Sequence, residues 1–435
     1  MSSLHQYKRQ RDEFQLFWGE LGDQLEKVTG FVERKSKLTG SKLVQILTLG
    51  SLERGTTSLR GFCRVADELG VCISEAGLHQ RLDKTAVELL RQVSQIYLSQ
   101  PSQGAVKEIL APFPHVHIVD STEIRLADGL RSAFRGTRTA SSLKVQLAYE
   151  YKQGHIEAIE IVPGCHPDQT SDVGAAVMER GDLVLFDLGY FDQKRFARLD
   201  QAGVMFVSRL HSQAGLYPTR DSRQALSLLD RVRGQGARGE LTVYLGSQER
   251  VAVRVLYYRL PEDIAAERRR KAHDTARKRG TMCSQHTLDS LDWLFFITNA
   301  PAVFLTLNQV AEVYRLRWQI ELVFKVWKSE MQVASFGPWR IERILTQFYA
   351  RLLALLFFHR VLEDYPQKQT SELSMIQAYQ LLRSNSARLI RIVKQSFRGF
   401  LSFVKDFMAD LRRFALKTKR RTHPSTFARL LALVA

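Results

Sequence analysis

Between residues 115 and 210 the sequence carries five short apolar runs, and their order limits the possible folds more than any other feature. The first three, HVHIVDST, LKVQLAYEY and HIEAIEIVP, have the composition of strands, and the turn-like Lys152-Gln153-Gly154 separates the last two. Two more runs, DLVLFDLGYF and VMFVSRL, alternate with stretches that we expect to be helical, from Gln169 to Arg180 and over DQKRFARLDQAG. Strands first in hairpins and then alternating with helices predict a mixed α/β sheet.

The first 110 residues are predicted to be helical, because apolar residues recur at helical spacing in FQLFWGELGDQLEKVTGFV and LVQILTLGSL. Within this part, one helix is expected to end at Gly70 and a second to begin at the N-cap Ser74. The second helix carries polar and basic residues, namely His79, Gln80, Arg81 and Lys84. A helix, a short turn and a basic helix are the outline of a helix-turn-helix that contacts DNA, although a plain helical scaffold has the same pattern.

The rest of the chain suggests three further regions. Residues 213 to 288 hold two predicted strands, ELTVYLG and VAVRVLYYRL, followed by the basic run Glu267 to Lys271, and are interpreted as an insertion. A strand, WLFFITN, and a helix from Leu307 then return to the sheet. The expected division is a helical DNA-binding region (1–110), the α/β core (111–212), a β-rich insertion (213–290), the second part of the core (291–345) and a helical basic region (346–435).

The charge balance points to a polyanionic partner. The chain has 63 Lys and Arg against 45 Asp and Glu, a net charge of +18, and nucleic acid is the interpretation that this surplus favours over anionic lipid or a solubilising bias. The four cysteines are widely spaced, which argues against a zinc ribbon or a disulfide framework. The start of the chain has no apolar signal region, and the run Leu352 to Phe358 is too short to span a bilayer. We therefore expect no membrane association and a cytoplasmic, nucleoid-associated protein.

Two acidic residues are expected at the ends of strands. Asp120 follows HVHIV and Asp187 follows LVLF. Acids at strand ends in an α/β sheet converge where ligands bind, and each is costly beside an apolar strand unless a cation compensates its charge.

A third acid lies on a predicted helix, AEVYRLRWQIELVFKVWKSE. At 100° per residue, one arc of about 60° collects four polar or amphipathic residues, namely Tyr314, Arg317, Glu321 and Lys328. An apolar stripe that includes Leu316 and Ile320 occupies another face and is expected to pack on the sheet. A carboxylate between cations stays ionised, as a metal ligand must, and the cations suit phosphates. An ordinary helix surface with an Arg317–Glu321 pair is the alternative.

Three blocks together carry a family resemblance. The spacing Y-x-x-R-x-x-x-E-x-x-x-x-x-x-K is matched without gaps by the four residues of this helix, and it resembles the signature of the DDE transposases of the insertion-sequence-four family. Asp120-Ser121-Thr122 and Asp187-Leu188-Gly189-Tyr190 resemble the first two acidic blocks of that family. The resemblance covers about residues 110 to 345.

The resemblance implies an RNase H-like catalytic core with a β-rich insertion before the Glu, flanked by helical regions. It also implies two Mg²⁺ ions, with Mn²⁺ as a substitute, held by Asp120, Asp187 and Glu321 for cut-and-paste transposition. Tyr314, Arg317 and Lys328 would position phosphates of the terminal inverted repeats and of the target DNA. The family analogy further implies a homodimer in the synaptic complex.

Weaker matches concern positions outside the three blocks. Trp293 lies where the family has a tryptophan that helps to hold a flipped base, or it is simply core. Arg209 resembles a family arginine that contacts DNA, or it is a surface residue at a strand end. Lys144 is a weak candidate for a phosphate contact. His166 and Asp168 are more typical of a turn-capping pair than of metal ligands.

Other functions remain open at this stage. An RNase H-like nuclease or resolvase would cut without joining, and a regulator or decayed transposase would bind ends without catalysis. A glycosidase pair of carboxylates fits the basic charge and the Arg and Lys neighbours less well than a phosphodiester does.

Overall fold

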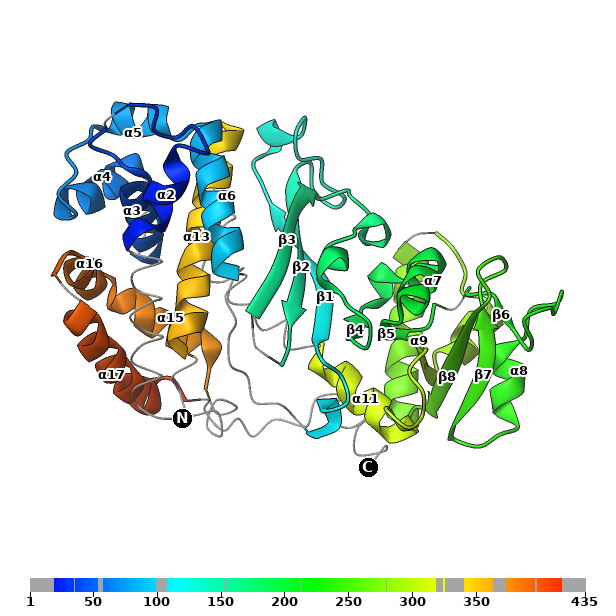
Figure 1. Ribbon diagram of the computed structural model, residues 1–435. Coiled ribbons are helices and arrows are strands. Elements are labelled where there is room, and N and C mark those ends of the chain that lie inside the picture. Colours follow the sequence, from blue (N-terminus) through cyan, green and yellow to red (C-terminus); the bar gives the residue numbers. More distant parts are fainter. Residues whose placement is uncertain are drawn as a thin grey trace.

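The computed structural model describes residues 19–34, 36–53, 58–98, 108–152, 155–211, 213–278, 280–317, 324, 340–362, 373–395 and 397–416. These residues form a helical part and a sheet part that lie side by side (Figure 1). Among the helices described, none is long and apolar enough to cross a membrane.

The helical part is built from both ends of the chain. Its N-terminal members are α2 (Leu21–Glu26), α3 (Gly40–Leu52), α4 (Leu59–Glu68), α5 (Glu75–Arg81) and α6 (Lys84–Leu98). Its C-terminal members are α13 (Ile341–Leu362), α15 (Met375–Ser384), α16 (Ser386–Gln395) and α17 (Phe397–Phe414). Helix α13 packs against α3 and α6, and Leu47 and Phe348 lie in the same apolar core without exposure to solvent. Two regions that are far apart in the sequence therefore form one hydrophobic unit.

The expected turn between two N-terminal helices is present. Helix α4 is followed by Gly70 with φ of +80°, and the side chain of Ser74 caps α5 by accepting from the backbone N–H of Gly77 at 3.1 Å. Arg81, however, donates to the carbonyl of Phe31 at 2.5 Å, and its guanidinium lies 4.1 Å from the Phe31 ring. Arg81 therefore joins α5 to the segment that follows α2. DNA contact by α5 stays a prediction, and the more exposed neighbours of Arg81 are the residues that would make it.

The sheet has nine strands among the described residues. They are β1 (Val116–Arg125), β2 (Ser142–Glu150), β3 (His155–Pro163), β4 (Leu183–Phe186), β5 (Met205–Arg209), β6 (Leu216–Tyr217), β7 (Arg238–Leu245), β8 (Val251–Arg259) and β9 (Trp293–Thr298), in the order β3-β2-β1-β4-β5-β9-β8-β7-β6. The strands β3, β2 and β1 are antiparallel, and β4 and β5 run parallel to β1. This order is that of an RNase H-like fold, which confirms the predicted fold class.

The expected insertion extends the same sheet. Strand β9 pairs with β5 on one side and with β8 on the other, both antiparallel, and β7 and β6 follow at the edge (Figure 1). Three helices accompany these strands: α8 (Leu228–Arg233), α9 (Glu262–Lys278) and α10 (Gln285–Ser290). The basic run Glu267 to Lys271 lies on α9. The hydrogen-bonded ladder is continuous from the core into the insertion.

Two local expectations were wrong. The stretch from Gln169 to Arg180 forms two short 3-10 turns, η4 (Asp168–Thr170) and η5 (Ala175–Val177), instead of a helix. Gly174 interrupts this stretch, because its φ of +79° lies outside the right-handed helical region, and it packs so closely that a Cβ would lie 2.5 Å from that of Ala148. Asp120 does not end its strand, because β2 pairs with β1 along its whole length, as far as Arg125.

The two faces of β1 pack against different cores. Ile118 and Ile124 belong to the large core that includes the helical part. Val119 belongs to a second core with Phe186 and with Phe196 of α7 (Gln193–Ala202). Because neighbouring residues of a strand point to opposite faces, Asp120 lies on the face of Ile118 and Ser121 on the face of Val119.

A buried ion cluster joins β1 to β3 and to the residue that precedes β4. His117 of β1 has no solvent exposure, and its Nδ1 and Nε2 lie 2.6 Å from Glu157 Oε2 and 3.0 Å from Asp182 Oδ2. Burial by itself would lower the pKa of His117, but hydrogen bonds and charge attraction from both carboxylates outweigh it and raise the pKa to about 9. The imidazolium is therefore part of the folded core.

We predict that this cluster makes stability fall in alkaline solution. The folded pKa lies above the ordinary value of 6.5, so the contribution of His117 is full below about pH 6.5 and is lost as the pH rises through about 9. Urea unfolding between pH 6 and 10 should show a loss on the order of 2–3 kcal/mol in the wild type. His117→Gln should be less stable at pH 7 and should lose much less between pH 7 and 10; parallel curves would contradict the assignment.

Candidate active site

Asp120 and Asp187 lie next to each other because of strand register. In the parallel pair β1–β4, Val119 is opposite Phe186, so the following residue of each chain segment reaches the same level of the sheet. Asp187 is the first residue after β4 and precedes the turn η6 (Leu188–Tyr190). Their side chains are 14% and 40% exposed, which leaves both accessible from solvent.

Helix α11 (Leu307–Leu316) brings two polar side chains to these acids. A capping box between Thr306 and Gln309 fixes where the helix begins. At its other end, the Tyr314 hydroxyl donates to Asp187 Oδ1 at 3.3 Å, and Arg317 Nη1 donates to Asp120 Oδ2 at 2.6 Å. Arg317 Nη2 also lies 3.8 Å from Asp187 Oδ1. Four of the residues predicted for the site therefore meet in one place.

This meeting point is more buried than the helical pattern indicated. Tyr314 and Arg317 are only 3% and 6% exposed, and the Tyr314 ring packs 4.9 Å from that of Phe296 in β9. Burial raises the pKa of Tyr314 above its ordinary value, so its hydroxyl keeps its proton and serves as a donor. The Arg317 guanidinium compensates the negative charge of both carboxylates.

Glu321 and Lys328 lie outside the described residues. Within the part of the chain that is described, no group of three or more His, Cys, Asp or Glu side chains is arranged to hold a metal ion. The donors that Asp120 and Asp187 offer are carboxylate oxygens, the kind that Mg²⁺ and Mn²⁺ prefer. The two described acids thus fit part of such a site, and the third ligand predicted for it is Glu321.

Arg209 and Trp293, the weaker candidates for DNA contact, have different surroundings. Arg209 ends β5 opposite Phe296, and its charge acts on Tyr314 and on Arg268 of α9. Burial is the main cause that lowers the pKa of Arg268 to about 10, and Arg209 adds to it. Trp293 is 7% exposed and packs against Tyr257 at a ring distance of 5.9 Å. The described conformation of Trp293 thus matches the core alternative, and its contact with DNA stays a prediction.

A polar cluster behind Asp120 was not expected. Asp168 Oδ1 accepts from Ser121 Oγ at 2.9 Å and from Lys144 Nζ at 3.0 Å. Lys144 also donates to the carbonyl of His166 at 2.6 Å, so its ammonium group is held by this bond and by the ion pair with Asp168. The sequence does contain a signal: in LKVQLAYEY, Lys144 and Gln146 alternate with apolar residues, which places both on one face of a strand that pairs with the Asp120 block.

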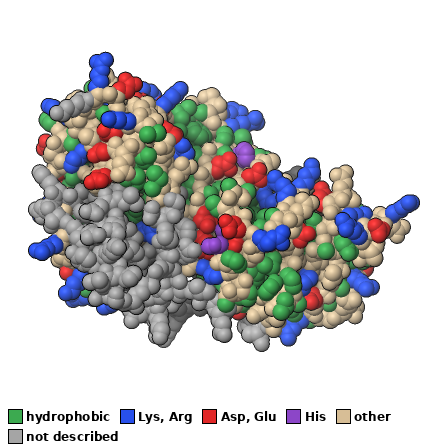
Figure 2. All heavy atoms as spheres, in the orientation of Figure 1, with side chains coloured by type: hydrophobic (Ala, Val, Ile, Leu, Met, Phe, Trp, Pro, Cys, Tyr) green, Lys and Arg blue, Asp and Glu red, His purple; other side chains and the backbone are tan. Residues whose placement is uncertain are grey.

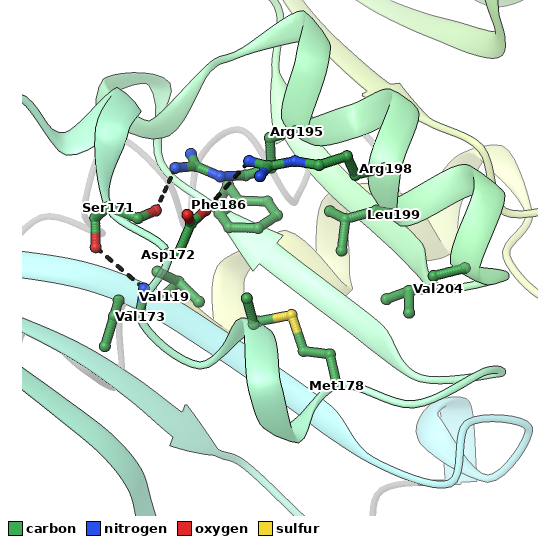
Figure 3. Close-up of a pocket in the computed structure, with 12 residues that line it drawn as sticks. Val119, Ser171, Asp172, Val173, Met178, Phe186, Arg195, Arg198, Leu199 and Val204 are labelled. Atoms are coloured by element: carbon green, nitrogen blue, oxygen red, sulfur yellow. Dashed lines mark hydrogen bonds and ion pairs between the residues drawn. The ribbon is translucent and has the colours of Figure 1, made fainter.

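A pocket of about 290 Å³ lies on the α7 face of the sheet (Figure 3). Its lining is mostly apolar and includes Val119, Phe186 and Met178. At its polar side, Arg198 pairs with Asp172 at 3.1 Å. Because Val119 points away from the face of Asp120, this pocket is separate from the paired acids.

Charged side chains are spread unevenly over the surface. On the face drawn in Figure 2, basic and acidic side chains are interspersed over the helical part and the outer end of the sheet, and one group of acidic side chains lies near the middle. The net charge of +18 is therefore not concentrated in one patch on this face.

The transposase DDE domain family matches residues 111–357, which include both acidic blocks and α11. The chain belongs to this family. This transposase is thus a DNA-cleaving and strand-transfer enzyme of the insertion-sequence type, as the three motif blocks predicted. Enzymes of the family act on DNA and use divalent metal ions.

Relatives extend the match to nearly the whole transposase. The transposase for insertion sequence element IS231B of Bacillus thuringiensis subsp. berliner is 26% identical, over 96% of this chain and 95% of the relative. The transposase for insertion sequence element IS1151 of Clostridium perfringens is 26% identical, over 93% and 92%. Among solved structures, the cryo-EM structure of the piggyBac transposase synaptic complex with hairpin DNA aligns with 95% of this chain and 86% of that chain, at 10% identity and a TM-score of 0.46.

We predict that Tyr314→Phe slows DNA cleavage by the transposase about ten- to hundredfold without unfolding it. The change removes the hydrogen bond to Asp187, and a bond to a charged group is worth about 1.5–3 kcal/mol, while the ring contact with Phe296 is kept. Rates of strand cleavage and the melting temperature should be measured together. A wild-type rate, or a rate loss fully matched by lost folded protein, would show that the hydroxyl has no part in the reaction.

Proposed function

We propose that this transposase excises and reinserts its own insertion sequence by cut and paste, with two Mg²⁺ ions held by Asp120, Asp187 and Glu321. The observation that carries the proposal is the convergence of Asp120, Asp187, Tyr314 and Arg317. In the sequence Glu321 follows Arg317 by four residues, the spacing of one helical turn. Mn²⁺ is the expected substitute ion.

Each residue of the site has a separate role in this proposal. When bound, the two ions activate the attacking oxygen and stabilise the leaving oxygen of the phosphodiester. Arg317 fixes Asp120, and its positive charge, only 7% exposed, acts strongly on a phosphate that approaches the acids. Tyr314 orients Asp187 by its hydrogen bond. Lys328 and Arg209 are proposed to contact DNA phosphates beside the cleavage site.

The DNA partners follow from this chemistry. We infer that the terminal inverted repeats of the element and a target duplex bind across the site, and that the protein acts as a homodimer at the nucleoid in the cytoplasm. The helical N-terminal region and the basic C-terminal region are proposed to recognise the ends and to dimerise. The expected division of the chain into regions is part of this proposal.

We predict that Asp120→Asn, Asp187→Asn and Glu321→Gln each reduce cleavage by about three orders of magnitude or more, the scale of losing a catalytic group. The assay is strand cleavage and joining of a linear DNA that carries the element's ends, in Mg²⁺, with end binding followed by gel shift. Binding should persist in all three variants. Asp230→Asn, an exposed carboxylate of α8, is the matched control and should cleave like the wild type.

The outcomes separate the competing functions. Retained cleavage in one variant removes that residue from the metal site. Cutting without joining by the wild type would indicate a nuclease, and end binding without cutting would indicate a regulator or a decayed transposase.

Trp293 has its own test. If it holds a flipped base during hairpin formation, Trp293→Ala should slow second-strand processing more than first-strand nicking. Equal slowing of both steps, together with a lower melting temperature, would leave Trp293 as a member of the apolar cluster with Tyr257.

A further inference from the structure

A carboxylate on the opposite face of β1 connects the two acidic blocks. Asp168 stands in η4, in the loop that follows β3, and its side chain is 23% exposed. Its Oδ1 accepts from Ser121 Oγ at 2.9 Å and from Lys144 Nζ at 3.0 Å. Lys144 is 13% exposed, so the pair is sheltered and its charges compensate each other.

Ser121 links this carboxylate to the catalytic face. Its hydroxyl donates to Asp168, while its backbone N–H donates to Asp120 Oδ1 at 2.8 Å. Because the other oxygen of Asp120 accepts from Arg317 at 2.6 Å, the carboxylate is held from both ends. Ser121 is thus hydrogen-bonded to both carboxylates, to Asp168 through its hydroxyl and to Asp120 through its backbone N–H.

The same loop also contacts the second acidic block. A Cβ on Gly189 would lie 3.2 Å from Asp168 Oδ2, so the backbone two residues after Asp187 passes directly beside the carboxylate. Arg195 also joins the two segments, because its guanidinium donates to the carbonyl of Tyr190 at 2.6 Å and to that of Ser171 at 2.5 Å. The loop and the turn after Asp187 are thus fastened to each other.

We propose that Asp168 is a positioning residue of the reaction: through Ser121 and the Gly189 turn it sets the orientation and spacing of Asp120 and Asp187 as metal ligands. This inference rests on the proposed function. Asp168 does not face the metal site itself, because the Ser121 side chain that it contacts points to the face of β1 opposite Asp120. Its Oδ1 accepts from Lys144 as well as from Ser121. Groups that hold metal ligands in place typically change metal affinity 10- to 100-fold when they are removed.

The test measures Mn²⁺ binding to the full chain by the loss of the free-ion paramagnetic resonance signal, and the Mn²⁺ concentration for half-maximal cleavage of end-bearing DNA. Asp168→Ala should weaken both about tenfold or more, with unchanged end binding in EDTA. Ser121→Ala should weaken them similarly, Ser121→Thr should restore them, and the Ser121→Ala/Asp168→Ala double variant should be no worse than either single variant. Asp172→Asn, an exposed carboxylate of the same loop, is the matched control and should behave as wild type.

The possible results are distinguishable. If Asp120→Asn loses Mn²⁺ and folded Asp168→Ala and Ser121→Ala bind it like the wild type, the positioning role is overturned and the proposed metal site stands. If Asp120→Asn itself binds Mn²⁺ like the wild type, the proposed metal site fails and the positioning role fails with it. If Asp168→Ala does not fold, Ser121→Ala decides the question by the same two measurements.

Discussion

Two like charges side by side repel each other, and the surroundings of β1 and β4 compensate that repulsion. The parallel register that aligns Val119 with Phe186 forces Asp120 and Asp187 together, which is unfavourable for two ionised carboxylates unless cations lie between them. Arg317 supplies one such charge from α11. Tyr314 of the same helix packs on Phe296 of β9, so the apolar contact and the cation are brought to the two acids together.

The strand and helix pattern was largely predictable because it depends on local periodicity. The strands from β1 to β5 and the N-cap Ser74 followed from periodicity and composition, whereas the approach of Tyr314 and Arg317 to the acids was expected from the family resemblance. Local pattern failed where tertiary contacts decide. The stretch from Gln169 to Arg180 forms no α-helix, and Gly174 within it has φ of +79° and packs closely against Ala148. Pairing with β2 carries β1 past Asp120.

The candidate site was predictable only in part, for the same reason. Acids at the ends of apolar runs, and a cation one helical turn before a carboxylate, can be recognised in a sequence. The role of Asp168 cannot, because it depends on a loop that folds back on the far face of β1 and meets Ser121 and Gly189 there. The burial of Arg317 was also hidden, since a helical wheel does not show that two faces of one helix are covered by different parts of the chain.

The continuous sheet has a mechanical consequence. Strand β9 is hydrogen-bonded to β5 and to β8, so a continuous ladder joins the insertion to the strands that carry the acids. The position of α9 relative to Asp187 is therefore set by the twist of the sheet. If the sheet does not bend, a duplex that reached from α9 to the acids would have to bend instead. The deformation energy would then be that of the DNA and would depend on its sequence.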